Sequence, residues 1–305
     1  MNDSERMLLR YVVEGDIRKS QQQAKIVLEG LTTVKDKVFK ETCLRTLAGK
    51  SPTLIELPYN LQGVLVAEDS TAFREDRFLI RDGEKAVVEK MCKTRRAALR
   101  LQEMGIRYTS SLLLMGEPGT GKTELARYIA HTLDLPFVYT NFSGLVDSGL
   151  GKTQKHIGLV FDYARKSPCV LCLDEIDAIG ARRGGKDDVA EMNCVTIALM
   201  QELDRLGNDL ILVGTTNRPD TLDDALFRRF TFGHTVRPLC RDDARILAKM
   251  FFASVGYSAS EAEIESLLGD SSKYYTASKI TNLCTDHIID WVLNQSYLRY
   301  GSHSD

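Results

Sequence analysis

The chain has 305 residues, 43% of them hydrophobic and 27% charged, and its formal net charge is −2. This composition is that of a globular protein long enough for more than one domain, and the charge gives no bulk attraction for nucleic acid or anionic lipid. No apolar run approaches the roughly eighteen residues of a membrane span, and the charged N-terminus has no signal-peptide core. We therefore expect a cytoplasmic protein.

The first 80 residues carry no recognisable motif. One stretch has apolar residues four, three and four positions apart, which predicts an amphipathic helix. These residues are Val27, Leu31, Val34 and Val38. The proline-punctuated residues 51–69 then contain two short strand-like pieces, and residues 82–106 predict a helix that enters the next domain.

Residues 112–133 combine an apolar run, a glycine-rich loop and an amphipathic helix, in that order. Leu112–Met115 is short and continuous, as expected of a strand buried on both faces. The loop reads GEPGTGKT over residues 116–123 and matches the phosphate-binding pattern G-x-x-x-x-G-K-[ST] in its required strand–loop–helix context. The helix is predicted by apolar residues four positions apart, which are Leu125, Ile129 and Leu133.

The chemistry of this loop favours the phosphates of a nucleotide. Its glycines let successive N–H groups point towards one place, and a helix N-terminus stabilises negative charge. Lys122 would neutralise the outer phosphates, and the Thr123 hydroxyl would ligate Mg²⁺. The predicted nucleotide-binding residues are Gly116, Pro118, Gly119, Thr120, Gly121, Lys122, Thr123, Glu124 and, from a later motif, Asp174.

A second Gly-Lys-Thr triplet ends the stretch DSGLGKT, residues 147–153. The phosphate-binding pattern would need a glycine five positions before Gly151, where Val146 stands. The residues in front of the triplet are polar and Gly-rich, so no apolar strand leads into it. The second triplet therefore does not predict a second nucleotide site.

Two further apolar runs end in polar residues suited to nucleotide chemistry. Asp174 and Glu175 follow residues 170–173, and ligands of open parallel sheets bind at this end of a strand. Asp174 would hold Mg²⁺, mostly through water, and Glu175 would orient and deprotonate the attacking water. Asn217, after Leu210–Val213, either reaches the γ-phosphate or the water, or only forms the turn before Arg-Pro.

Adjacent arginines, Arg228 and Arg229, stand at the predicted end of a helix in TLDDALFRRF. Such a pair is ordinarily a solvated helix face. The alternative is an arginine finger, which a subunit supplies to the nucleotide of its neighbour and which often raises the rate by about 10³–10⁵.

Four stretches, GEPGTGKT, VLCLDEID, VGTTNRPD and LDDALFRRF, in this order and spacing, resemble the AAA+ ATPases. They look most like the protein-remodelling branch that contains katanin, spastin and the Vps four ATPase. The resemblance implies an α/β fold: a P-loop domain with a parallel sheet flanked by helices, a small helical lid, and a homo-oligomeric ring, usually hexameric, with ATP between subunits. We therefore expect an N-terminal extension over residues 1–80, a large nucleotide-binding domain over 81–238, and a helical lid with a tail over 239–305.

By matching position, the resemblance also assigns roles to single residues. ATP and Mg²⁺ would be bound through the loop already described, with Thr123 and Asp174 as the metal-holding pair. The residues to which it assigns catalysis are Glu175, Asn217, Arg228 and Arg229.

In that family, a loop after the second core strand faces the central pore and usually carries an aromatic–hydrophobic–glycine triplet. Gly149, Leu150 and Gly151 stand on that triplet, so the resemblance makes this segment a substrate pore loop. Gly149 replaces the aromatic residue, and leucine offers less contact area than Trp or Tyr, so we expect weaker or more selective gripping. The alternative is a surface loop without substrate contact. Residues 180–191 are a second candidate pore loop, or a solvated one.

Residues 239–292 have helical periodicity, as expected of the lid. A first helix over residues 241–256 would bury one face and end near Gly256. That face is predicted to hold Ile246, Leu247, Met250 and Phe251. In a later helix, Lys279 is either a phosphate sensor or a solvated lysine, and His287 is expected to pack in the core.

Together these features predict ATP hydrolysis at subunit interfaces of a ring, coupled to remodelling, disassembly or threading of a protein substrate or an adaptor-bound partner. Residues 1–80 would hold the specificity for that partner, or would only extend the core. One alternative function is that of a DNA-associated loader-type ATPase, against which stand the near-neutral charge and the lack of a recognisable DNA-binding module. The other is a slow ATP-switched scaffold, with which the non-aromatic pore loop is compatible.

Overall fold

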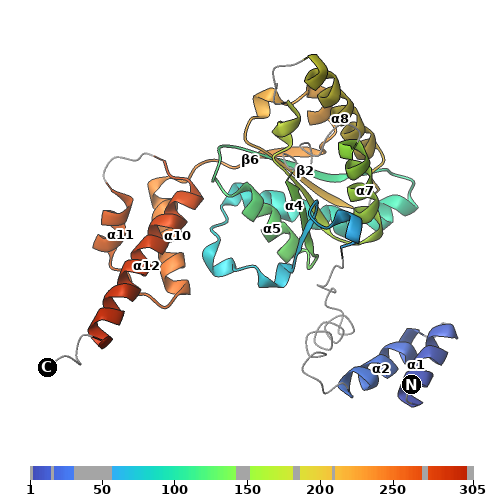
Figure 1. The fold of residues 1–305 in the computed structure, drawn as a ribbon, viewed down its shortest axis with the longest axis horizontal. Coiled ribbons are helices and arrows are strands. Elements are labelled where there is room, and N and C mark those ends of the chain that lie inside the picture. The colour runs from blue at the N-terminus through green and yellow to red at the C-terminus, as the bar shows by residue number, and fades with distance from the viewer. Residues whose placement is uncertain are drawn as a thin grey trace.

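The computed structural model describes residues 3–14, 17–30, 57–141, 152–180, 186–207, 210–269 and 274–300. A large α/β part and a smaller, all-helical part are joined by a single connection after the last strand (Figure 1). Two N-terminal helices, α1 (Asp3–Val13) and α2 (Ile17–Glu29), pack against each other. In the described ranges no helix is both long and apolar enough to cross a membrane.

The large part is built on one sheet whose described strands run in the order β1-β3-β4-β5-β2-β6. All pairs are parallel except β1 with β3, where Val66 faces Tyr139 in antiparallel register. The α/β class with a mostly parallel sheet, predicted from the sequence, is confirmed. The strands are β1 (Val66–Glu68), β2 (Ser110–Met115), β3 (Phe137–Asn141), β4 (Val170–Asp174), β5 (Ile211–Thr216) and β6 (Phe232–Thr235).

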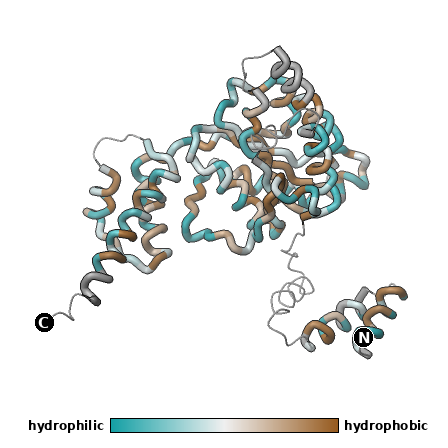
Figure 2. Tube along the Cα trace, viewed as in Figure 1, coloured by the Kyte–Doolittle hydropathy of each residue, from teal (hydrophilic) through white to brown (hydrophobic). Residues whose placement is uncertain are grey.

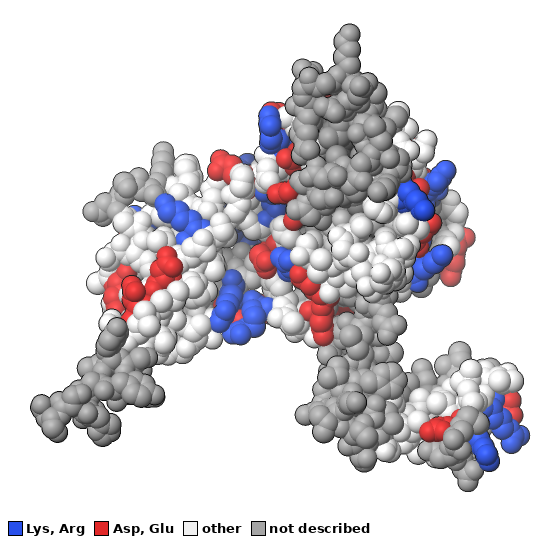
Figure 3. Space-filling model, viewed as in Figure 1, with Lys and Arg blue, Asp and Glu red and all other residues white. Residues whose placement is uncertain are grey.

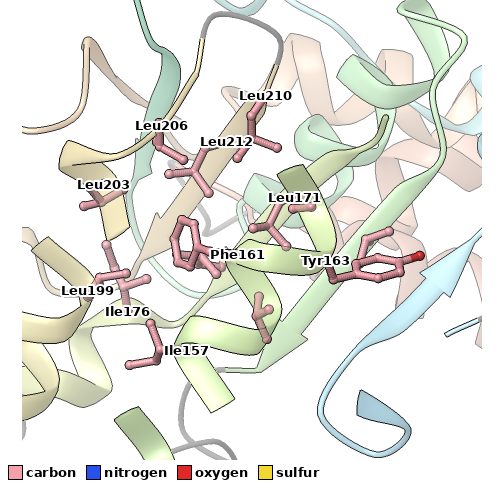
Figure 4. Close-up of a cluster of buried hydrophobic side chains, with 14 of the residues drawn as sticks. Ile157, Phe161, Tyr163, Leu171, Ile176, Leu199, Leu203, Leu206, Leu210 and Leu212 are labelled. Atoms are coloured by element: carbon pink, nitrogen blue, oxygen red, sulfur yellow. The ribbon is translucent and has the colours of Figure 1, made fainter. Parts of the chain in front are cut away.

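Helices cover both faces of this sheet because successive side chains of a strand point to opposite faces. Leu112 and Leu114 of β2 belong to the cluster under α4 (Asp82–Glu103) and α5 (Lys122–Thr132). Leu113, between them, belongs to the cluster under α7 (Lys152–Lys166) and α8 (Lys186–Asp204). Phe161 of α7 points into the middle of that second cluster (Figure 4). The chain trace is accordingly hydrophobic along the sheet and more hydrophilic outside it (Figure 2).

The helical part, called the lid below, consists of α10 (Arg241–Ser254), α11 (Glu261–Leu268) and α12 (Ala277–Tyr300). It has its own core, to which α10 contributes Ala244, Leu247, Ala248, Phe251 and Phe252. The predicted apolar face of α10 is wrong at one position, because Ile246 is 46% exposed. Ala244 and Ala248 are fully buried, so the buried face is rotated away from Ile246.

Other details of the lid agree with the sequence. Helix α10 ends at Ser254, and Gly256 follows with a positive φ of 73°. His287 packs edge-on against Phe252 and Tyr257, and its Nε2 lies 3.0 Å from the Tyr257 hydroxyl. The packed histidine predicted from its helical spacing is thus observed.

Residues 57–80 lie against the large part and the lid. Strand β1 extends the sheet, and the short helix η4 (Glu75–Arg77) reaches the end of α10, where Arg77 Nε donates to Ser254 Oγ at 2.8 Å. This segment therefore packs as an extension of the core, one of the two roles that the sequence left open. Of the predicted N-terminal amphipathic helix, Val27 lies in α2, and Leu31, Val34 and Val38 lie outside the described residues.

Candidate nucleotide-binding site

The candidate site lies where three neighbouring strands end. β4, β5 and β2 are adjacent in the sheet and parallel, with Leu173 opposite Gly214 and Met115 opposite Thr216. The residues that follow these strands therefore meet at one edge. Sheet topology alone brings together side chains that are up to about a hundred residues apart in the sequence.

The loop after β2 is shaped by glycines in conformations that other residues rarely adopt. Gly116, Gly119 and Gly121 have φ values of 142°, 76° and 100°. A Cβ on Gly116 would lie 2.3 Å from the carbonyl oxygen of Val236, so no side chain fits there. Within the loop, Thr120 Oγ1 donates to the Glu117 carbonyl at 2.9 Å. The loop thus leads directly into the N-terminus of α5, where unpaired N–H groups favour an anion.

Lys122 is the first residue of α5, and its ammonium group turns back over the loop. Its Nζ donates to the carbonyls of Gly116 and Glu117, both at 2.9 Å, and to Asn217 Oδ1 at 2.7 Å. The backbone of Asn217 is fixed in turn, because its N–H donates to Asp177 Oδ1 at 3.2 Å. The lysine and the asparagine, predicted separately, are therefore in contact.

Burial and nearby carboxylates act in opposite directions on this lysine. Burial lowers its pKa from the ordinary lysine value, and the carboxylates of Asp174, Asp177 and Glu175 partly offset that change. One positive charge thus faces three negative ones at the strand ends. A divalent cation would neutralise the excess.

The acidic pair after β4 is fixed by hydroxyl groups. Thr123 Oγ1 lies 3.2 Å from Asp174 Oδ1 and 3.4 Å from Oδ2. Thr215 Oγ1 donates to Asp174 Oδ1 and accepts the Glu175 N–H at 3.1 Å. Glu175 itself has a φ of 57°, and its carboxylate makes no hydrogen bond with the described residues. Its side chain lines the cavity described next.

A cavity of about 960 Å³ opens over these residues, between the large part and the lid. The lid closes one side through the start of α12, where the Ser278 N–H donates to the Gly119 carbonyl at 3.1 Å. On the face shown in Figure 3, acidic and basic side chains of the described residues are interspersed. The predicted residues that line the cavity are Pro118, Gly119, Thr120, Gly121, Lys122, Thr123, Glu124, Asp174, Glu175 and Asn217, whereas Gly116 lies at the base of the loop.

The Thr123 hydroxyl and the Asp174 carboxylate fit Mg²⁺. They are hard oxygen donors held next to each other and to the loop that would carry phosphates. In the part of the chain that the structure describes, no cluster of three or more His, Cys, Asp or Glu residues forms a metal site by itself. Mg²⁺ needs no such cluster, because in phosphate-binding sites it takes one or two protein oxygens and completes its shell with phosphate and water.

Arg228 and Arg229 lie outside this cavity, directly after α9 (Asp224–Phe227). Arg229 is held within its own chain: its Nε and Nη2 donate to Asp204 at 3.0 and 3.1 Å, and its Nη1 donates to the Ala225 carbonyl at 2.8 Å. Arg228 is exposed, and its side chain makes no hydrogen bond or ion pair with the described residues; only its backbone N–H is bonded, to the Asp224 carbonyl at 3.1 Å. The structure therefore does not bring the arginine pair to the nucleotide side of the same chain.

Three other predictions concern the two candidate pore loops and the phosphate sensor Lys279. Gly149, Leu150 and Gly151 lie outside the described residues, as do residues 181–185 of the second candidate pore loop. Residues 186–191, which belong to the same predicted loop, instead begin α8, so the loop prediction is wrong there. Lys279 does not line the cavity, and its Nζ lies 5.7 Å from the centre of the Tyr275 ring. The roles proposed for the two loops stay predictions.

Sequence reasoning missed Thr215 and Asp177. Both act on their neighbours through hydrogen bonds between strand ends, which no local pattern encodes. A weak signal was present for Thr215, since a polar residue is unexpected at a buried position next to the apolar run of β5.

Comparisons with known proteins agree with this geometry. Residues 112–237 match the family described as "ATPase family associated with various cellular activities (AAA)". The 26S proteasome regulatory subunit S10B homolog B of Arabidopsis thaliana is 32% identical over 212 residues, which are 64% of this chain and 52% of that protein.

Two relatives of other kinds also match. The peroxisomal ATPase PEX6 of Candida glabrata is 32% identical over 197 residues, 61% of this chain and 19% of its own length. The ATP-dependent zinc metalloprotease FtsH 2 of Alkaliphilus metalliredigens is 36% identical over 162 residues, 51% of this chain and 23% of its own. The chain thus spans about half of the proteasome relative and less of the other two.

Proposed function

Because residues 112–237 form a domain of the AAA ATPase family, we propose that the protein hydrolyses ATP at contacts between copies of itself in a ring, and uses the energy to remodel, disassemble or thread a protein partner. The observation that carries the proposal is the convergence of Lys122, Thr123, Asp174 and Glu175 on one cavity. Lys122 and Thr123 begin α5 after the glycine-rich loop, Asp174 and Glu175 stand at the end of β4, and the chemistry of the two pairs is complementary.

ATP binding would depend on the loop after β2. Its N–H groups and the N-terminus of α5 surround the phosphates, and Lys122 pairs with the outer ones, in reach of Asn217. Thr123 and Asp174 would hold Mg²⁺, which supplies positive charge at the phosphate oxygens when bound. The adenine end would lie in the remaining cavity towards the lid.

Hydrolysis would depend on Glu175. Its carboxylate is not engaged by any described residue and lines the cavity, so it can accept a proton from water as that water attacks the γ-phosphate. Asn217 would orient the same water or the phosphate, while Lys122 stabilises the charge that develops.

The position of the arginines supports the proposed ring. Arg228 is exposed and outside the cavity of its own chain, so we assign it to the nucleotide of another copy rather than to that of its own chain. Arg229, bound to Asp204, would fix the backbone from which Arg228 projects. A hexamer is the proposed form of this ring, as the resemblance to katanin, spastin and the Vps four ATPase implies.

A protein partner is favoured by the relatives. One is named a proteasome subunit and another a protease, while the interspersed charges in Figure 3 show no basic stripe for nucleic acid on that face. The substrate pore loop at Gly149–Gly151 and the cytoplasmic location are parts of the same proposal. Placement in the katanin and spastin branch also remains a proposal, supported by Arg-Arg-Phe at residues 228–230.

The test is the Glu175→Gln variant. It keeps the size and polarity of the side chain but cannot take the proton, so ATP should bind with unchanged affinity while turnover falls by about 10²–10⁴. Binding is measured with a fluorescent ATP analogue and turnover by phosphate release. Lys249→Gln, which changes an exposed lysine of the lid, serves as the control and should behave as wild type. Normal turnover by Glu175→Gln would refute the assignment.

A further inference from the structure

We propose that Thr215 is a positioning residue that sets the geometry of both acidic side chains through one buried hydroxyl group. The inference rests on the proposed ATP hydrolysis and goes beyond it, because Thr215 is not one of the catalytic residues of that mechanism. Its hydroxyl donates to Asp174 Oδ1 and accepts the N–H of Glu175 at 3.1 Å. A single oxygen atom thus joins the end of β5 to two consecutive residues at the end of β4.

The first effect is on Asp174. Its Oδ1 is the acceptor for Thr215, so the rotation of the carboxylate is fixed from the side of the sheet. Thr123 contacts the same carboxylate from the side of the loop, at 3.2 Å. With Oδ1 so engaged, Oδ2 is the atom with the greater capacity left for a metal-bound water or the metal. Thr215 therefore decides which oxygen Asp174 presents.

The second effect is on Glu175. Its φ of 57° is an unfavourable conformation for a residue with a side chain, and it persists only where the surroundings hold it. The hydrogen bond from its N–H to Thr215 is such a restraint. This turn of the backbone directs the Glu175 side chain into the cavity instead of along the strand. Without the restraint, the carboxylate would lose its fixed distance to the phosphates.

The Thr215 hydroxyl is suited to this role because the residue is buried, although it borders the cavity. Thr215 is 1% exposed, so water cannot easily replace the hydroxyl when it is removed. A buried N–H without an acceptor is costly, and a hydrogen bond to a charged carboxylate is among the stronger ones. A change of this one hydroxyl should therefore alter the arrangement of both acids.

The test compares Thr215→Val with Thr140→Val. Valine keeps the shape of threonine but can neither donate nor accept. Thr140 is the matched control, because it is 2% exposed, lies beside β4 opposite Leu173, and has a hydroxyl without a partner. We expect Thr215→Val to lower kcat by about 10- to 100-fold with KM for ATP changed by less than about threefold, since Lys122 and its loop are untouched. Thr140→Val should keep both constants.

Two further measurements separate positioning from general damage. Thr215→Ser keeps the hydroxyl and should recover most of kcat, whereas Thr215→Ala, which lacks it, should not. In nucleotide-free protein, hydrogen exchange of a peptide spanning residues 170–178 should be faster in Thr215→Val than in wild type, because the Glu175 N–H has lost its acceptor. If Thr215→Val does not fold, the Ser and Ala pair carries the comparison.

Each outcome has one meaning. If the wild-type protein hydrolyses no ATP, the proposed function fails, and the exchange measurement still tests the hydrogen bond. If wild type is active and Thr215→Val keeps its kcat, or if serine is as damaging as alanine, the inference is overturned. A rise in KM with unchanged kcat would also overturn it, because Thr215 would then act on ATP binding.

Discussion

The two places where the sequence predicts catalytic residues are built differently. At the phosphate end of the cavity, most of the side chains are held by neighbours in the same chain: Lys122 by Asn217, and Asp174 by Thr123 and Thr215. At Arg228 and Arg229, called the arginine edge below, Arg229 is held by Asp204, but the Arg228 side chain is exposed and has no hydrogen-bond or ion-pair partner in the described ranges. The difference teaches that the side chains around the cavity are positioned within one chain, whereas Arg228 faces away from it.

The largest effect is expected at the arginine edge. Arg228→Ala should lower turnover by about 10³–10⁵ without weakening ATP binding, because the missing charge acts on the transition state of a neighbouring chain. The measurement is phosphate release, beside the affinity for a fluorescent ATP analogue.

A mixture sharpens this prediction. Arg228→Ala keeps Glu175 and Glu175→Gln keeps Arg228, so mixed rings contain contacts in which both residues are present. Mixing two nearly inactive variants should restore turnover well above either one alone. If the mixture stays inactive while the variants assemble, Arg228 does not act across a subunit contact, and the comparison between the two regions breaks down.

At the phosphate end, a smaller and different loss is expected. Lys122→Ala removes a charged donor that faces the phosphates, which should weaken ATP binding by about 10- to 100-fold at any protein concentration. Titration of the fluorescent analogue measures it. Mixing Lys122→Ala with Arg228→Ala should not restore ATP binding to the sites that lack the lysine, because the residues that bind the phosphates all come from one chain. Unchanged binding would contradict the role of the loop.

The smallest effect concerns the support of the arginine edge. Asp204→Ala removes the partner of Arg229 in an ion pair whose side chains are 31% and 56% exposed, so unfolding should become easier by no more than about 1 kcal/mol. Turnover should fall by less than about threefold if Arg229 only supports the backbone. Thermal melting and phosphate release check both points, with Glu103→Ala as a control at a more exposed pair. If turnover fell as much as in Arg228→Ala, Arg229 would be the arginine that acts on the nucleotide of the neighbouring chain.

The sequence was most informative where contacts are local. The loop at residues 116–123 could be predicted because its glycines, its lysine and the following helix lie within one short stretch. The strands that end at Asp174 and Asn217 could be predicted because a strand buried on both faces is an unbroken apolar run.

Prediction failed where the answer depends on distant partners. Ile246 has the right spacing for the buried face of α10, but the packing of α12 decides where that face lies. Thr215 acquires its role only when β5 lies beside β4. These positions are set by tertiary contacts rather than by local preference.

The lid is fastened to the large part at both ends of α10, and the two fastenings differ in kind. Near its start, Arg81 donates to the carbonyls of Arg237 and Pro238, and its charge is shared with buried Glu84 at 2.6 Å. At the far end, about 20 Å along the helix, Arg77 donates to the Ser254 hydroxyl and lies over the Phe251 ring, and Arg74 donates to the Ser254 carbonyl at 3.4 Å. The start of α10 is thus held through a buried ion pair, and its end through a hydroxyl, a carbonyl and an aromatic ring. Salt should therefore weaken the exposed contacts at Ser254 more than the buried pair at Arg81.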